Sequence, residues 1–95
     1  MLSEFPINLD KVPKENLDKE ILRLGMIAEL DAVSLYEQLA ASTKNQKIKR
    51  VLLDIAKEEK THVGEFQALL LELDREQENE LAEGKKEVKE FSQIE

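Results

Sequence analysis

An acid and the only histidine of the sequence interrupt an apolar row in its second half. The row alternates steps of three and four residues, the spacing of one helix face, and consists of Ile48, Leu52, Ile55, Glu59, His62, Phe66, Leu69 and Leu73. Glu59 and His62 are three residues apart, so a helix places them one turn apart on the same face. A carboxylate and an imidazole so placed can share a divalent cation.

A third ionisable residue, Glu29, interrupts an earlier apolar row made of Leu22, Met26, Glu29, Val33, Tyr36 and Ala40. Glu29 and Glu59 each lie fifteen residues from Lys44 in the expected connection. An antiparallel hairpin therefore places both at the same height, roughly 22 Å from the turn. Two facing carboxylates in an apolar layer are costly unless a cation compensates them. We predict that Glu29, Glu59 and His62 bind metal.

The prediction depends on the coincidence of all three residues. A single histidine in an apolar row is more often a packed core residue than a ligand. Charged helices also contain Glu-x-x-His strings by chance, and Glu58, Lys60 and Glu65 are assigned to a solvated face.

Helical periodicity predicts an all-α fold in one domain over residues 1–95, built on an antiparallel two-helix hairpin. The predicted segments are an irregular amino-terminal part at 1–13, a first helix at 14–41, a second helix at 44–73 and a short third helix at 75–91. A two-helix hairpin is half of a four-helix bundle of the kind found in ferritin, so dimerisation would complete four helices.

Local signals predict where these helices begin and bend. Pro13 is suited to open the first helix, with Asn16 as the alternative start. Thr43 and Gln46 have the spacing of a capping box for the second helix. The third helix is expected to break or bend near Gly84, because glycine weakens a helix interior.

Composition excludes several classes of partner and site. The formal net charge of −7 disfavours nucleic acid and anionic membranes as partners. Without cysteine, the chain offers no disulfide, thiolate zinc site, iron–sulfur cluster or rubredoxin-type iron centre. The amino terminus has no secretory signal pattern, and no apolar run is long enough to cross a membrane, so we expect a cytoplasmic protein.

The predicted donors are half of the set that ferritin-like di-iron bundles use, which is one Glu from each of two helices and a Glu-x-x-His pair from each of the others. A two-fold homodimer would supply four carboxylates and two imidazoles. Carboxylates with imidazole fit iron better than copper or calcium, although zinc, manganese or calcium can substitute.

Two stretches, AELDAVSLYEQLAAST and DIAKEEKTHVGEF, resemble the encapsulated ferritin-like proteins, half-length relatives of ferritin housed inside encapsulin nanocompartments. The resemblance covers residues 20–73 and implies that Glu29, Glu59 and His62 bind iron across a dimer interface. It also implies that Tyr36 lies behind the metal ligands and that dimers assemble into a decameric ring.

The chain departs from this family at positions that affect iron uptake. Some members carry an acid where this chain has Ala28, and an aromatic residue where it has Leu35. Asp31 matches an acidic position that the family links to metal uptake. An altered uptake path is therefore expected.

The resemblance implies a ferroxidase that oxidises Fe(II) to Fe(III) with dioxygen. The mineral would be stored in an encapsulin compartment, with the encapsulin shell protein as partner. No targeting peptide is evident after Phe91, and the ending SQIE is compatible with a domain edge in a fusion to the shell protein.

Two alternatives remain at this stage. A rubrerythrin-like peroxidase would need an external electron donor, because no cysteine is present to hold a second iron centre. A non-catalytic module, binding metal or purely structural, would dimerise through the two rows and use Glu29, Glu59 and His62 as a polar layer that sets the register.

Overall fold

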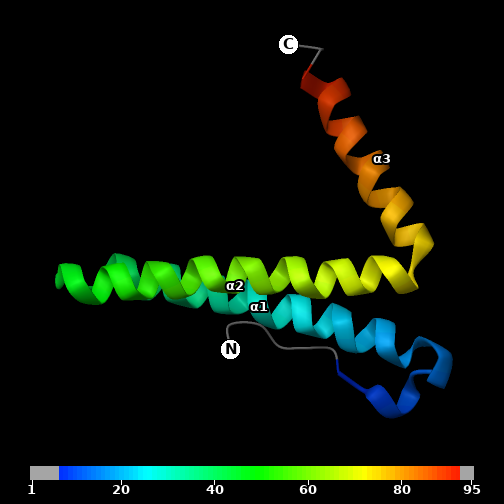
Figure 1. Cartoon of the computed structure of the whole chain (residues 1–95), viewed down its shortest axis with the longest axis horizontal. Helices are drawn as coiled ribbons and strands as arrows, with labels where there is room; N and C mark the ends of the chain where they lie inside the picture. The colour runs from blue at the N-terminus through cyan, green and yellow to red at the C-terminus, as the bar shows by residue number, and fades with distance from the viewer. Residues whose placement is uncertain (1–6, 93–95) are drawn as a thin grey trace.

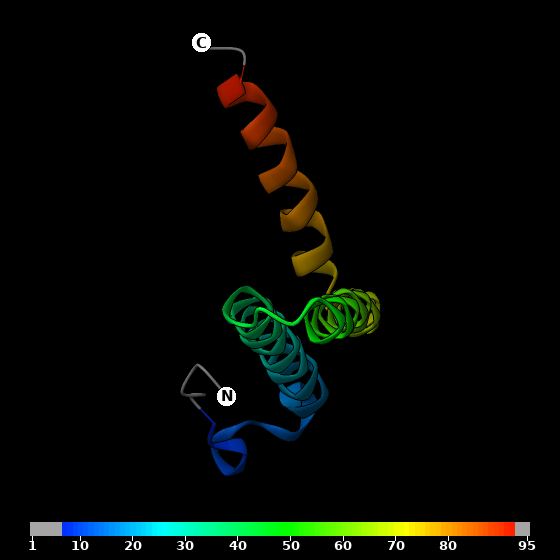
Figure 2. The same cartoon turned by 90° about the vertical axis from the view of Figure 1, so that its left-hand side faces the viewer.

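The computed structural model describes residues 7–92, and within this range the chain is helical without any strand. Three α-helices, α1 (Leu17–Ser42), α2 (Gln46–Leu73) and α3 (Arg75–Ser92), follow two 3₁₀ turns at Leu9–Lys11 and Lys14–Asn16. Helices α1 and α2 lie side by side, and α3 leaves the hairpin at a steep angle (Figures 1 and 2). The prediction of an all-α hairpin with a third helix is confirmed. None of the helices in the described range is long and apolar enough to span a membrane.

Helix α1 begins at Leu17, three residues later than the preferred start. Pro13 has an extended backbone, with φ −55° and ψ 143°, and it precedes the 3₁₀ turn Lys14–Asn16 rather than an α-helix. Asn16, the alternative start, occupies the position before the first helical residue. Of the predicted irregular segment at 1–13, residues 1–6 lie outside the described range.

The connection between α1 and α2 is three residues long, and its polar side chains hold it together. Asn45 caps α2: its Oδ1 accepts hydrogen bonds from the backbone N–H of Lys47 at 3.0 Å and of Ile48 at 3.1 Å. The Thr43 hydroxyl accepts a hydrogen bond from the N–H of Asn45 at 3.2 Å. The predicted capping box of Thr43 and Gln46 is therefore wrong, because the Asn45 amide reaches the first free N–H groups.

Small residues allow the two hairpin helices to approach closely. Ala40 of α1 and Ala56 of α2 are each 2% exposed. Near the other end, Gly25 faces Phe66, and a Cβ atom at Gly25 would lie 3.1 Å from the phenyl ring. The Phe66 ring therefore rests against the backbone of α1, and a Cβ atom at Gly25 would require the ring to shift by a few tenths of an ångström.

The hairpin leaves much of its apolar surface uncovered. Three residues of the row that carries Glu59 and His62 are about half exposed: Ile48 (49%), Leu69 (50%) and Leu73 (49%). Apolar side chains on α3 are also exposed, including Val88 and Phe91. Contacts within the single chain thus leave apolar side chains of α2 and α3 exposed to solvent.

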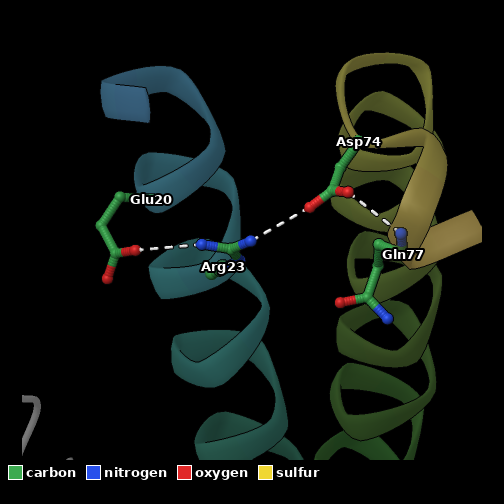
Figure 3. A network of polar contacts seen from close by, with 4 residues as sticks. All are labelled: Glu20, Arg23, Asp74 and Gln77. Atoms are coloured by element: carbon green, nitrogen blue, oxygen red, sulfur yellow. Dashed lines mark hydrogen bonds and ion pairs between the residues drawn. The ribbon is translucent and has the colours of Figure 1, made fainter. Parts of the chain in front are cut away.

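A polar network at Asp74 connects α3 to the hairpin (Figure 3). Oδ1 of Asp74 accepts a hydrogen bond from the backbone N–H of Gln77 at 3.0 Å, and Oδ2 accepts one from Arg23 of α1 at 3.1 Å. Arg23 also contacts Glu20 at 3.4 Å. Helix α3 then runs without a break through Gly84, so the predicted break at this residue is wrong. A helical glycine costs only about 1 kcal/mol, and the residues around it favour a helix.

Candidate metal centre

Glu29, Glu59 and His62 come together across the hairpin. Glu29 is on α1, while Glu59 and His62 lie one turn apart on α2. The His62 Nδ1 atom lies 3.3 Å from Oε2 of Glu29 and 3.3 Å from Oε2 of Glu59. Among the described residues, these three form the group of acidic and imidazole side chains that can hold a metal ion, with one donor atom from each within 4.8 Å of the others.

The three side chains are sunk into the hairpin to different depths. The Glu29 and Glu59 side chains are 21% and 19% exposed, whereas the His62 side chain is 45% exposed. The carboxylates therefore lie between the helices, and the imidazole lies towards the open face. Because apolar residues precede and follow the pair on α2, the charges are set within an otherwise apolar row.

The carboxylates of Glu29 and Glu59 contain more hydrogen-bond acceptor atoms than the single proton on the His62 Nδ1 atom can satisfy. Nδ1 can carry a single proton, and both carboxylates approach that atom at 3.3 Å. When Nδ1 carries no proton, three electron-pair donors face one another. A divalent cation among them would bond to all three donors and offset the two negative charges.

The donor types suit iron, and their number is half of what two irons need. Carboxylate oxygens are hard ligands, and imidazole also binds ferrous iron. Ferritin-like di-iron sites take one Glu from each of two helices and a Glu-x-x-His pair from each of the other two. The hairpin supplies one Glu on α1 and one Glu-x-x-His pair on α2.

A cavity of about 360 Å³ adjoins the cluster, lined by Glu29, His62, Glu65, Phe66 and Leu69. Glu65 is exposed, as its assignment to a solvated face predicted, yet it also lines this cavity. Sequence analysis missed that second role. The available signal was its spacing of three residues from His62, which puts it one turn along α2.

The other residues singled out by resemblance are not part of the group formed by the three donors. Asp31 is two positions from Glu29 on α1 and is 8% exposed, so its carboxylate is buried. Tyr36 is half-buried, seven residues or about 10 Å along the helix from Glu29. Leu35 is exposed and Ala28 is half-buried. The roles of Asp31 in metal uptake and of Tyr36 behind the ligands stay predictions.

A helical hairpin with one Glu on its first helix and Glu-x-x-His on its second defines a half-bundle of the ferritin-like class. The sequence model of the rubrerythrin family matches residues 20–95, and the chain belongs to this family. Its members are typically di-iron oxidoreductases.

Individual relatives agree with this assignment. The chain is 57% identical over 98 residues to a ferritin-like–encapsulin shell fusion protein of Pyrococcus furiosus, covering 100% of the chain and 28% of the relative. It is 38% identical over 69 residues to an encapsulin nanocompartment cargo protein of Myxococcus xanthus, covering 70% of the chain and 53% of the relative. The chain thus spans about a quarter and about half of the lengths of these relatives.

A solved structure also matches the whole chain. The crystal structure of an encapsulated ferritin domain from Pyrococcus furiosus superposes with a TM-score of 0.83 at 54% identity. The match covers 100% of this chain and 99% of that one. The resemblance to encapsulated ferritin-like proteins is confirmed.

Proposed function

We propose that the chain is a ferroxidase that oxidises Fe(II) to Fe(III) with dioxygen at a di-iron site shared by two copies. The observation that carries this proposal is the cluster of Glu29, Glu59 and His62, whose donor atoms lie within 4.8 Å of one another. Membership of the rubrerythrin family supports the proposal that the metal is iron and that the reaction is an oxidation or reduction.

The second copy is required by the number of donors. One hairpin offers two carboxylates and one imidazole, which are too few to enclose two ions. A two-fold dimer would double this set and balance the four positive charges of two ferrous ions with four carboxylates. The row that carries Glu59 and His62 also presents Ile48, Leu69 and Leu73 half exposed, as an interface with a second copy requires.

Each donor has a distinct role in this proposal. Glu29 and Glu59 attract the ferrous ions and favour the ferric product, since hard carboxylates bind the higher charge more strongly. His62 supplies a nitrogen ligand that also suits ferrous iron. Two Fe(II) ions would each give one electron to dioxygen, which with two protons from water becomes hydrogen peroxide. Tyr36 would take the position behind the ligands that the resemblance implies.

The product is stored elsewhere in this proposal. Two relatives are named as an encapsulin shell fusion and as an encapsulin cargo protein. We therefore place the chain inside an encapsulin nanocompartment of the cytoplasm, delivering ferric iron to the lumen. Dimers would assemble further into a decameric ring, with the exposed apolar side chains of α3 available for contacts between them.

Aerobic addition of Fe(II) to the purified chain tests the activity. We expect ferric absorbance to rise faster than in buffer, and the rate to fall by about tenfold or more in Glu59→Ala and His62→Ala, because each variant removes a metal ligand. Glu58→Ala is the matched control, since Glu58 is an exposed acid next to Glu59 and lies outside the cluster.

The alternative is a structural module in which the three residues set the dimer register. In that case iron oxidation would be the same in the wild type, Glu59→Ala and His62→Ala, and would not exceed the rate in buffer. Sedimentation of each variant under the same conditions shows whether the dimer persists.

A further inference from the structure

The cavity beside the metal cluster has one carboxylate at its rim. Glu29 and His62 form its inner part, Phe66 and Leu69 contribute apolar surface, and exposed Glu65 provides the remaining lining. Apart from Glu29, Glu65 is the only acid among the lining residues. The cavity therefore connects the candidate ligands with a carboxylate in contact with solvent.

Helix geometry places Glu65 at the edge of the ligand row and outside it. Glu65 follows His62 by three residues, so it lies about 60° around α2 and about 4.5 Å along the axis from His62. It lies about 100° around the helix from Phe66, its neighbour in the sequence. Glu65 therefore lies at the edge of the row that the proposed second copy would cover, and it is exposed in the single chain.

Other acids near Glu29 are less available to an arriving ion. Asp31 is buried, at 8% exposed, and position 28 is an alanine. Glu59 is mostly covered and does not line the cavity. Glu65 is thus the carboxylate of this cavity that a hydrated cation meets first.

We propose that Glu65 captures hydrated Fe(II) at the rim of the cavity and passes it to His62 and Glu29. This inference rests on the proposed function and names the uptake residue of the same site. A carboxylate oxygen can replace one water ligand of a divalent ion without oxidation or group transfer. Phe66 and Leu69 offer no donors, so nothing on the cavity wall retains the ion between Glu65 and the cluster.

A capture residue affects the rate at low metal concentration more than the saturated rate. An exposed carboxylate attracts a divalent cation through water, and salt screens this attraction. Removing the charge in Glu65→Gln should lower kcat/KM for Fe(II) by about three- to tenfold at low ionic strength and leave kcat unchanged. The difference should shrink as salt is added.

Glu72→Gln is the matched control for this variant. Glu72 is seven residues further along α2, on the same side of the helix, and it is exposed but does not line the cavity. Both variants remove one negative charge from the same helix. Stopped-flow binding of Co²⁺, followed by its visible absorbance, gives a second readout that does not depend on iron oxidation.

The proposal predicts that Glu65→Gln slows both Fe(II) turnover at low concentration and Co²⁺ binding, while Glu72→Gln leaves both close to wild type. Equal effects in the two variants overturn it, because only net charge would then matter. Loss of equilibrium Co²⁺ binding in Glu65→Gln also overturns it, since Glu65 would then be a ligand. If Glu65→Gln slows Co²⁺ binding but the wild type oxidises no iron, the proposed function fails and the capture role stands.

Discussion

At the scale of single residues, Gly25 provides the space in which Phe66, one wall of the cavity beside Glu29 and His62, packs against α1. The Phe66 ring lines that cavity and packs against α1 at Gly25, where a Cβ atom would come within 3.1 Å of three ring atoms. Gly84 has no atom within 4 Å of an added Cβ, so the two glycines differ in packing while both are helical. Gly25 is needed for the close approach of the Phe66 ring to α1, whereas Gly84 only weakens α3.

Substitution of the two glycines should therefore change stability in opposite directions. Gly25→Val should lower the free energy of unfolding by about 1–3 kcal/mol, because the side chain forces the Phe66 ring away from α1. Gly84→Ala should raise the stability of α3 by up to about 1 kcal/mol through helix propensity. Urea unfolding at one protein concentration measures both, and an unchanged midpoint for Gly25→Val would contradict the packing argument.

At the scale of elements, the direction of α3 depends on a junction with few contacts. Asp74 accepts the N–H of Gln77 at the start of α3 and also contacts Arg23, which lies 51 residues earlier on α1. The bond from the Gln77 backbone N–H holds the pKa of Asp74 below its ordinary value. The positive charges of Lys19 and Arg23 act in the same direction, while burial opposes them.

Two variants of Asp74 separate the cap from the ion pair. Asp74→Asn keeps an oxygen that can accept the Gln77 N–H but loses the charge, so α3 should loosen slightly. Asp74→Ala loses both interactions and should loosen α3 more. The rate of amide hydrogen exchange at Gln77 measures how far α3 loosens, and we expect it to be fastest in Asp74→Ala. Equal exchange rates in the two variants would show that the cap is unimportant.

The same junction should be sensitive to acid. Because the folded pKa of Asp74 lies below the ordinary 3.8, its stabilisation is complete above that value and is lost as the pH falls through the lower folded pKa. Protection of the Gln77 amide in the wild type should therefore approach that in Asp74→Asn at acidic pH. A difference between the two that persists at the lowest pH would argue against the carboxylate as its cause.

At the scale of the whole molecule, the chain is more open than a compact domain of its length. Its radius of gyration is 16.9 Å, whereas a compact domain of this length has about 12 Å. Its accessible surface is 7627 Å², compared with roughly 5600 Å² for a monomeric protein of this mass. The surplus of about 2000 Å² exceeds the roughly 800 Å² that each partner buries in a standard interface.

We predict that metal removal weakens the proposed dimer. If two copies share the ions, metal binds the dimer and not the separate chain, so a chelator should raise the dissociation constant of the dimer by about tenfold or more. Sedimentation over a range of concentrations, with and without chelator, measures this shift. A monomer with and without metal would contradict the shared site.

Much of the hairpin and of the candidate site could be predicted from the sequence. Helical periodicity and the length of the connection are local properties, and together they require α1 and α2 to be antiparallel. Equal distances from Lys44 then bring Glu29 to the level of Glu59, and the spacing of three brings in His62. The meeting of these residues follows from helix geometry alone, and the structure brings the three side chains together as expected.

The remaining features depended on tertiary structure or on small local differences. The start of α1 at Leu17, the cap at Asn45 and the continuity through Gly84 each involve choices worth only about 1 kcal/mol, which local patterns do not resolve. A contact between Arg23 and Asp74 connects the start of α3 to α1, and Phe66, which packs against Gly25, forms part of the wall of the cavity at Glu65. Both arise between residues far apart in the chain, so only the packed helices determine them.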